Sequence, residues 1–328
     1  MATIRDVSKL AQVSVATVSR VLNGGYVNHE TKKRVTNAMQ QLNYKPSMIA
    51  QSLNSKKSKT IALVIPNITN PYFSNLAKAV DDVAKENGYK VLLFNTDDKD
   101  ENIDYYLNIA RQKYIDGLIM ATPLKDYKSQ SDVPIVVLDR VKDKSVDSVV
   151  SNNRNGGKIA TQHLIDIGCR KIAHIKGTQD ITTAQERYQG YLEVLSEYNL
   201  INESLVVEGN FDLDSAKDAT GKLLLEQPDI DGIFAGNDLM AVGALKAIKK
   251  MGKRIPEDVA LIGFDGIDFS RYTEPELSTI AQPIYDMGAL STRVLLDKIN
   301  GLSKDITFHE LDVSLIKRGS TKRQSKGE

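Results

Sequence analysis

Residues 3–53 read TIRDVSKLAQVSVATVSRVLNGGYVNHETKKRVTNAMQQLNYKPSMIAQSL, and this stretch decides the organisation of the chain. Residues 1–59 hold ten of the 43 lysines and arginines, but only two of the 42 acidic residues, Asp6 and Glu30. The formal net charge of +1 therefore combines a strongly basic head with a mildly acidic body. This distribution is typical of a nucleic-acid-binding module joined to a domain that controls it.

The apolar spacing of this head predicts three short helices, at about residues 4–12, 15–23 and 29–43. Thr3 can cap the first helix in a capping box with Asp6, and Ser14 can cap the second. Two short helices joined by so brief a turn predict a helix-turn-helix, whose second helix fits the major groove. In that second helix the residues expected to face inward are Val15, Val18, Val21 and Leu22, and those expected to face outward are Ala16, Thr17, Ser19 and Arg20.

A small amphipathic bundle with a solvated charged face would fit this pattern about as well. Three features favour DNA binding: the clustered bases, the small outward residues of the second helix, and the continuation SMIAQSL. The run TIRDV-x-x-LA-x-VS-x-ATVSRVLN, followed by YKP-x-x-x-A-x-SL, resembles the N-terminal signature of the lac/galactose repressor family of bacterial transcription regulators.

By this resemblance, residues 1–46 form the helix-turn-helix domain, and residues 47–59 form a hinge helix and linker. The hinge helix would fold only on DNA, where Leu53 would wedge into the minor groove; the alternative is that Leu53 simply packs against the body. The DNA-binding residues that the resemblance implies are Thr3, Ser14, Val15, Ala16, Thr17, Ser19, Arg20, Asn23, Lys33, Tyr44, Ala50 and Leu53.

From residue 60 onward, short β-branched runs alternate with amphipathic segments of helical length. The predicted strands are 60–66, 90–96, 116–122, 134–140, 171–177, 232–238 and 259–266, and the predicted helices include 74–88, 102–112, 157–168 and 238–252. This alternation predicts an α/β fold with doubly wound parallel sheets. The body resembles the two-lobed periplasmic sugar-binding fold, which implies one lobe at about 60–152 and 283–311 and another at about 153–282 and 312–328.

Ligands of open parallel sheets bind beyond the carboxyl ends of the strands. There the motifs NPYF, LDR, RYQGY, NFD, NDLMAVGAL, GFDG and TIAQ resemble those of ribose-binding proteins and ribose repressors. The ligand-binding residues that this resemblance implies are Asn70, Tyr72, Phe73, Asp139, Arg140, Arg187, Phe211, Asn237, Asp265 and Gln282. Tyr72 stands where phenylalanine is usual, and Arg187 is expected at a helix start.

Such side chains suit a small polyhydroxylated ligand. Carboxylate, amide and guanidinium groups can bridge adjacent hydroxyls, while aromatic rings cover the C–H faces of a sugar. Each residue also has an ordinary alternative, such as a helix cap for Asn237, a core position for Phe211 or a surface base for Arg187. Because several of these motifs occur in repressors of other sugars, the sequence favours a sugar more firmly than it favours ribose.

Other classes of protein lack support in the sequence. No apolar stretch is long enough for a membrane span, and the N-terminus has no signal-peptide pattern. The single Cys169 fits a reducing cytoplasm, and one cysteine with four scattered histidines offers no metal-ligand spacing. No dinucleotide-binding, P-loop or serine-hydrolase motif occurs, so neither a cofactor nor catalysis is expected.

The sequence therefore predicts a cytoplasmic, homodimeric repressor of a sugar-utilisation operon, which a small sugar releases from a palindromic operator. Two-fold symmetry matches a palindrome, and the tail after residue 305 lacks the leucine heptads of a tetramer. The direction of the sugar effect rests on the resemblance to ribose repressors. The alternative is a global catabolite control regulator that docks a phosphorylated phosphocarrier protein.

Overall fold

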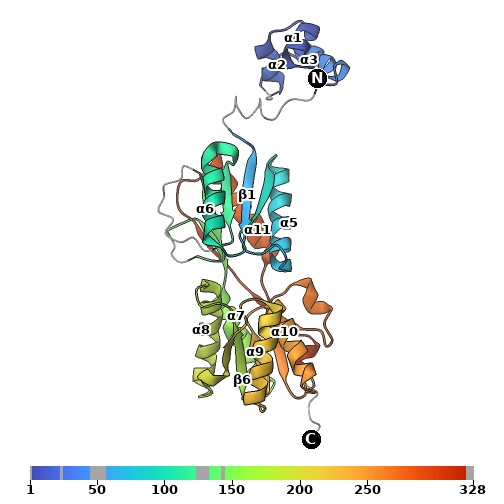
Figure 1. Ribbon diagram of the computed structural model, residues 1–328. Coiled ribbons are helices and arrows are strands. Elements are labelled where there is room, and N and C mark those ends of the chain that lie inside the picture. The colour runs from blue at the N-terminus through green and yellow to red at the C-terminus, as the bar shows by residue number, and fades with distance from the viewer. Residues whose placement is uncertain (1, 23–24, 45–56, 123–132, 142–144, 323–328) are drawn as a thin grey trace. The chain divides into compact units, whose positions relative to one another are not determined.

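The computed structural model describes residues 2–22, 25–44, 57–122, 133–141 and 145–322 (Figure 1). The chain divides into two compact units, Met1–Lys59 and Thr60–Glu328. None of the helices in these described stretches is long and apolar enough to cross a membrane.

The first unit packs three helices, α1 (Ile4–Ala11), α2 (Val15–Leu22) and α3 (His29–Gln41), around one small core. The predicted caps are present. Thr3 and Asp6 form the capping box of α1, and Ser14 Oγ accepts a hydrogen bond from the Thr17 amide at 3.1 Å. The buried core side chains are Val7, Ala11, Val18, Val35 and Ala38.

The prediction that Val15 faces inward is wrong, because its side chain is 40% exposed. Helical side chains tilt toward the N-terminus. The first residue of α2 therefore points beyond the helix end, past the core that Val18 helps to fill.

The second unit contains two lobes, and the sheet of lobe one has the order β11-β5-β4-β3-β1-β2 with every pairing parallel. Its strands are β1 (Thr60–Ile65), β2 (Lys90–Asn95), β3 (Gly117–Met120), β4 (Ile135–Leu138), β5 (Ser148–Ser151) and β11 (Phe308–Leu311). Helices α5 (Pro71–Glu86) and α11 (Ile284–Ile299) pack on one face, and α6 (Asp100–Ile109), continued by η1 (Ala110–Tyr114), packs on the other (Figure 1).

The sheet of lobe two has the order β12-β10-β9-β8-β6-β7, and only its edge strand β12 runs antiparallel to its neighbour. Its strands are β6 (Ile172–Lys176), β7 (Val206–Glu208), β8 (Gly232–Ala235), β9 (Ala260–Asp265), β10 (Ser278–Ala281) and β12 (Ser314–Ile316). Helices α7 (Asn153–Asp166) and α8 (Thr182–Glu197) cover one face, while α9 (Leu213–Glu226) and α10 (Asp238–Lys250) cover the other.

Five strands, β5, β7, β10, β11 and β12, lie outside the predicted set of strands. Each has only three or four residues, and β11 (FHEL) and β5 (SVVS) contain polar residues that shorten the apolar run. Helices α5 and α7 also begin earlier than predicted, because Asn70 and Asn152 cap them. The chain passes between the lobes near residues 152, 282 and 312, and these crossings bring the ends of the two sheets together.

His174 on β6 is fully buried in the core of lobe two, beside the rings of Tyr191 and Phe234. Its Nδ1–H donates to the Phe234 carbonyl at 2.9 Å, whereas Nε2 has no hydrogen-bond partner among the described residues. Burial lowers the pKa of His174 from 6.5 to about 3. The unfolded chain therefore binds a proton at this side chain below pH 6.5, while the folded protein stays neutral there.

We expect the wild-type protein to lose stability relative to a His174→Phe variant as the pH falls from about 6.5 toward 4.5. The expected size is about 1.4 kcal/mol per pH unit, because only the wild type carries this proton linkage. Thermal unfolding of both proteins at about pH 7.5 and about pH 5 measures the effect. A difference in midpoint that does not change with pH would contradict it.

Candidate functional site

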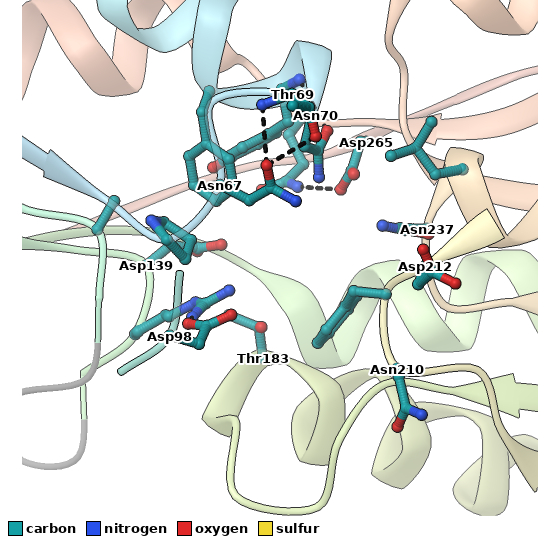
Figure 2. Close-up of a pocket in the computed structure, with 18 of the residues that line it drawn as sticks. Asn67, Thr69, Asn70, Asp98, Asp139, Thr183, Asn210, Asp212, Asn237 and Asp265 are labelled. Atoms are coloured by element: carbon teal, nitrogen blue, oxygen red, sulfur yellow. Dashed lines mark hydrogen bonds and ion pairs between the residues drawn. The ribbon is translucent and has the colours of Figure 1, made fainter. Parts of the chain in front are cut away.

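A cavity of about 290 Å³ lies between the lobes, where the carboxyl ends of both sheets meet (Figure 2). Lobe one contributes residues that follow β1, β2, β3 and β4. Lobe two contributes residues of α8, residues that follow β7 and β8, and Asp265 at the end of β9, and Gln282 lies just after β10. Figure 2 shows Asp98 and Asp139 across this space from Asn237 and Asp212. The position agrees with the rule that open parallel sheets bind ligands at this edge.

All ten predicted ligand-binding residues line this one cavity: Asn70, Tyr72, Phe73, Asp139, Arg140, Arg187, Phe211, Asn237, Asp265 and Gln282. Arg187 lies in the second turn of α8 rather than at the helix start, because α8 already begins at Thr182. Phe211 is only half-buried, so its ring combines core packing with a place in the cavity wall.

Two asparagines, one from each lobe, are held as helix caps. Asn70 Oδ1 accepts from the Tyr72 amide at 3.0 Å at the start of α5, and Asn237 Oδ1 accepts from the Met240 amide at 2.8 Å at the start of α10. These bonds fix the orientation of both amide groups and leave each Nδ2 as a donor on the cavity side. The cavity therefore has oriented donors on both of its walls.

Two buried carboxylates supply acceptors. Asp139 Oδ1 accepts from the Ser151 amide at 3.0 Å and from Asn153 Nδ2 at 3.1 Å, and Asp265 Oδ1 accepts from Gln282 Nε2 at 2.7 Å. Each acid thus commits one oxygen to the protein and keeps the other for a ligand. Burial raises the pKa of Asp265 to about 6, so this carboxyl is charged at neutral pH.

Arg187 is the cationic centre of the cavity and is only 4% exposed. Its Nε donates to Asn153 Oδ1 at 2.8 Å, and its Nη1 donates to the Gly236 carbonyl at 2.6 Å and to Asp265 Oδ1 at 3.4 Å. The guanidinium carbon lies 3.7 Å from the ring centroid of Phe264. Stacking and hydrogen bonds together fix this side chain, so it can present its remaining N–H groups to a ligand.

Three aromatic side chains, Tyr72, Phe73 and Phe211, form part of the cavity wall. Tyr72 and Phe73 meet edge to face, with ring centroids 5.0 Å apart. The ring of Phe211 lies against Gly177, where any side chain would collide with it. Burial, and secondarily the charge of Asp139, raises the pKa of Tyr72 well above 10, and its hydroxyl has no hydrogen-bond partner among the described residues.

The sequence interpretation missed several polar residues of the cavity wall, namely Asn67, Thr69, Asp98, Thr183, Asn210 and Asp212. Asp98 forms an ion pair with Arg140 at 2.9 Å, so the predicted ligand contact Arg140 already has an anionic partner. The signal for Asp98 was its position just after the β2 strand, the same criterion that identified Asp139. The acidic run DDKD that contains it is equally typical of a solvated loop, so this signal alone is weak.

Asp238 does not line the cavity, but it holds the segment that carries Asp265. Its carboxylate accepts from the amides of Gly266 and Ile267, both at 2.9 Å, and from Thr279 Oγ1 at 2.6 Å. These contacts stabilise the turn after Asp265, whose own backbone φ is 111°. Asp238 therefore positions a site residue, although Asn237 is the residue that caps α10.

The arrangement suits reversible binding of a small polar molecule. It offers paired carboxylates, oriented amides, two guanidinium groups and three aromatic rings, which together match the hydroxyl groups and C–H faces of a sugar. Among the described residues, no cluster of His, Cys, Asp and Glu is arranged to hold a metal ion.

The predicted DNA-binding residues lie on the first unit. Thr3, Ser14, Val15, Ala16, Arg20 and Lys33 are exposed, and Thr17, Ser19 and Tyr44 are half-buried. Three further predicted residues, Asn23, Ala50 and Leu53, lie outside the described part of the chain. Exposed small residues beside an arginine on α2 give a surface that can approach base edges closely.

Comparison with known proteins agrees with this division of the chain. The family model described as bacterial regulatory proteins of the lacI family matches residues 3–47. The model described as periplasmic binding proteins and sugar binding domain of the LacI family matches residues 58–323.

Among curated proteins, a ribose operon repressor of Halalkalibacterium halodurans is 47% identical over 98% of this chain and 98% of its own length. A lac repressor dimer bound to operator and an anti-inducer is 28% identical, covers 98% of this chain and 99% of that one, and has a TM-score of 0.89. A LacI-family regulator of Enterococcus faecium with bound ribose is 31% identical, covers 80% of this chain and 98% of that one, and has a TM-score of 0.72. The chain therefore belongs to the lacI family of bacterial regulatory proteins.

Proposed function

We propose that this protein represses a ribose-utilisation operon, binding a palindromic operator as a homodimer and leaving it when ribose fills the cavity. The observation that carries the proposal is the cavity itself, in which buried acceptors, oriented donors and aromatic rings converge from both lobes. Its volume of about 290 Å³ lies at the lower end of the range of ligand pockets, which favours a small effector. The kinship with a ribose operon repressor supports ribose as that effector.

The proposed switch is a change in the arrangement of the lobes. Ribose binds at their junction, so its affinity depends on how they face each other, and it shifts the population toward the arrangement that it binds better. In a homodimer, that shift alters how the two DNA-binding heads reach their half-sites. The residues that hold the sugar thus also carry the regulatory signal.

Control by a phosphorylated phosphocarrier protein is the competing proposal. That mechanism does not require a cavity with directed donors and acceptors, whereas direct sensing of a sugar does. The two mechanisms differ in the molecule that changes operator binding: a sugar in direct sensing, and the phosphorylated phosphocarrier protein in the alternative.

The test is a titration of the full-length protein against its operator, which is first recovered by selection from random DNA duplexes. Fluorescence anisotropy would then be measured with ribose, with other pentoses, hexoses and purine bases, and with a phosphorylated phosphocarrier protein. We expect millimolar ribose to weaken operator binding. No response to ribose would exclude ribose as effector, tighter binding would reverse the direction of control, and a response only to the phosphocarrier protein would favour the competing mechanism.

Arg20 is expected to read bases, because it is exposed on α2 and can make a bidentate contact with guanine. We expect Arg20→Ala to cost about 1–3 kcal/mol in operator affinity and to relax base preference at one position in each half-site. The matched comparison is Lys33→Ala on α3, which should weaken all DNA about equally and lower the salt slope by roughly one. An unchanged ratio of specific to nonspecific affinity in Arg20→Ala would contradict this role.

A further inference from the structure

Six buried residues form a closed ring of hydrogen bonds across the junction of the lobes, in which Ser151 takes part with both its backbone N–H and its hydroxyl. In order around the ring they are Asp139, Ser151, Gln282, Asp265, Arg187 and Asn153. None is more than 8% exposed. Asp139 follows β4 in lobe one, Arg187 and Asp265 belong to lobe two, and the other three stand where the chain crosses between the lobes.

We propose that Ser151 and Asn153 are positioning residues for effector binding, which close this ring and orient Asp139, Asp265 and Arg187 without touching the ligand themselves. This inference rests on the proposed function of the same cavity. Neither residue is among those that line the cavity, whereas the other four members all are.

Ser151, the last residue of β5, hydrogen-bonds to two members of the ring. Its Oγ lies 2.6 Å from Gln282 Oε1, to which it donates, and 3.1 Å from Asp139 Oδ1. Gln282 follows β10, so this single hydroxyl ties the first crossing of the chain to the second. Because its amide nitrogen also donates to Asp139, Ser151 holds one acid through the backbone and reaches the other through Gln282.

Asn153, the first residue of α7, both donates and accepts within the ring. Its Nδ2 donates to Asp139 Oδ1 at 3.1 Å, and its Oδ1 accepts from Arg187 Nε at 2.8 Å. The amide thus connects the carboxylate of one lobe with the guanidinium of the other. Replacing either partner would leave a buried polar group unsatisfied.

The ring has no free end, and this closure restricts its members. In an open row of hydrogen-bonded side chains, the terminal side chain can change rotamer and the others can follow. In a closed ring, each acid keeps one orientation as long as all the hydrogen bonds persist. The ring uses Oδ1 of each carboxylate, so the second oxygen of each acid can accept from a ligand in the cavity that both acids line. The affinity for a polyhydroxylated ligand should therefore depend on residues that the ligand never meets.

A matched pair of variants at Ser151 tests the proposal. Threonine and valine have almost the same shape and both suit a strand, but only threonine keeps the hydroxyl. By calorimetry of the full-length protein with ribose, we expect Ser151→Val to bind roughly tenfold more weakly than Ser151→Thr. Equal dissociation constants for the folded pair would overturn the proposal, whatever happens to their thermal midpoints, because a purely structural role would change stability alone.

If the ring is closed, the effects of Ser151→Val and Asn153→Ala on ribose affinity should not be independent in the double variant Ser151→Val/Asn153→Ala. The first substitution already opens the ring, so the second should raise the ribose dissociation constant by a smaller factor than it does alone. Factors that multiply, or a combined effect larger than their product, would show that the two residues act separately and would overturn the ring.

A readout without sugar separates this proposal from the proposed function. The Nε–H signal of Arg187 in a nitrogen–proton NMR spectrum, identified by its loss in Arg187→Lys, reports the opposite side of the ring from Ser151. We expect this proton to exchange with water several times faster in Ser151→Val than in Ser151→Thr. If wild-type protein ignores ribose while this difference is present, the proposed function fails and the ring stands; if the Arg187 signal is the same in both variants, the ring itself fails.

Discussion

An Asp265→Ala variant should bind its operator normally and fail to respond to ribose, so that it represses permanently. Asp265 is 5% exposed and lines the cavity, and its carboxylate holds Gln282 and Arg187 through Oδ1, so its other oxygen can accept from a ligand. Because the pKa of Asp265 is raised only to about 6, the wild-type group is charged at pH 7.5 and is a strong acceptor for sugar hydroxyls. Removing it leaves those hydroxyls, and the guanidinium of Arg187, without their anionic partner.

The expected loss is about 2–4 kcal/mol of ribose affinity, at which millimolar ribose no longer fills the site. Anisotropy titrations of operator with and without ribose measure it, and the exposed Asp268→Asn is the matched control, since it removes a nearby carboxylate outside the cavity. Full release of Asp265→Ala from DNA by the ribose concentration that releases wild type would rule out this role. Loss of operator binding without sugar would instead show that Asp265 acts in folding.

The sequence was sufficient to predict those site residues that follow long apolar strands. Asp139, Asn237 and Asp265 follow IVVL, GIFAG and LIGF, so the β-α alternation alone places them at the carboxyl ends of parallel strands. The same reasoning missed the ring partners Ser151 and Asn153, because they stand at the junction of a four-residue strand and a helix that begins earlier than its apolar pattern.

The sequence did not reveal the backbone conformation of the cavity wall, either at the missed Asp98 and Asn210 or at the predicted Asp139 and Phe211. Asp98, Asp139, Asn210 and Phe211 all have positive φ, between 52° and 63°, a region that disfavours residues other than glycine. Local propensity would not place a phenylalanine there, yet this conformation lets the Phe211 ring lie against Gly177 at the cavity wall. Long-range packing imposes these backbone conformations, so a short sequence pattern does not predict them.

Arg187→Met should have the other large effect, and it should reduce both ribose binding and stability. Methionine keeps much of the length and apolar packing of the side chain but supplies no donor. Asn153 Oδ1, the Gly236 carbonyl and Asp265 Oδ1 would then each lose a partner inside a site that excludes most water. Breaking a buried pair in this way costs about 3–5 kcal/mol, because an uncompensated charge stays behind. Protonation of Asp265 would reduce this loss of stability in part, because the pKa of Asp265 is about 6 and would rise further without the guanidinium.

The instructive comparison is Arg154→Met on α7, which removes an exposed arginine paired with Glu193. A surface pair of that kind is worth at most about 1 kcal/mol, so this control should change the thermal midpoint little and leave ribose release intact. The variant Arg187→Lys tests whether the positive charge alone is sufficient. The ammonium keeps the positive charge beside Asp265, but it cannot reach the Asn153 and Gly236 acceptors together or stack on Phe264 as the planar guanidinium does. We therefore expect Arg187→Lys to recover part of the stability of Arg187→Met without recovering ribose release. If lysine restores ribose release fully, the site needs only a positive charge at this position, and the fork geometry of Arg187 is not what holds the sugar.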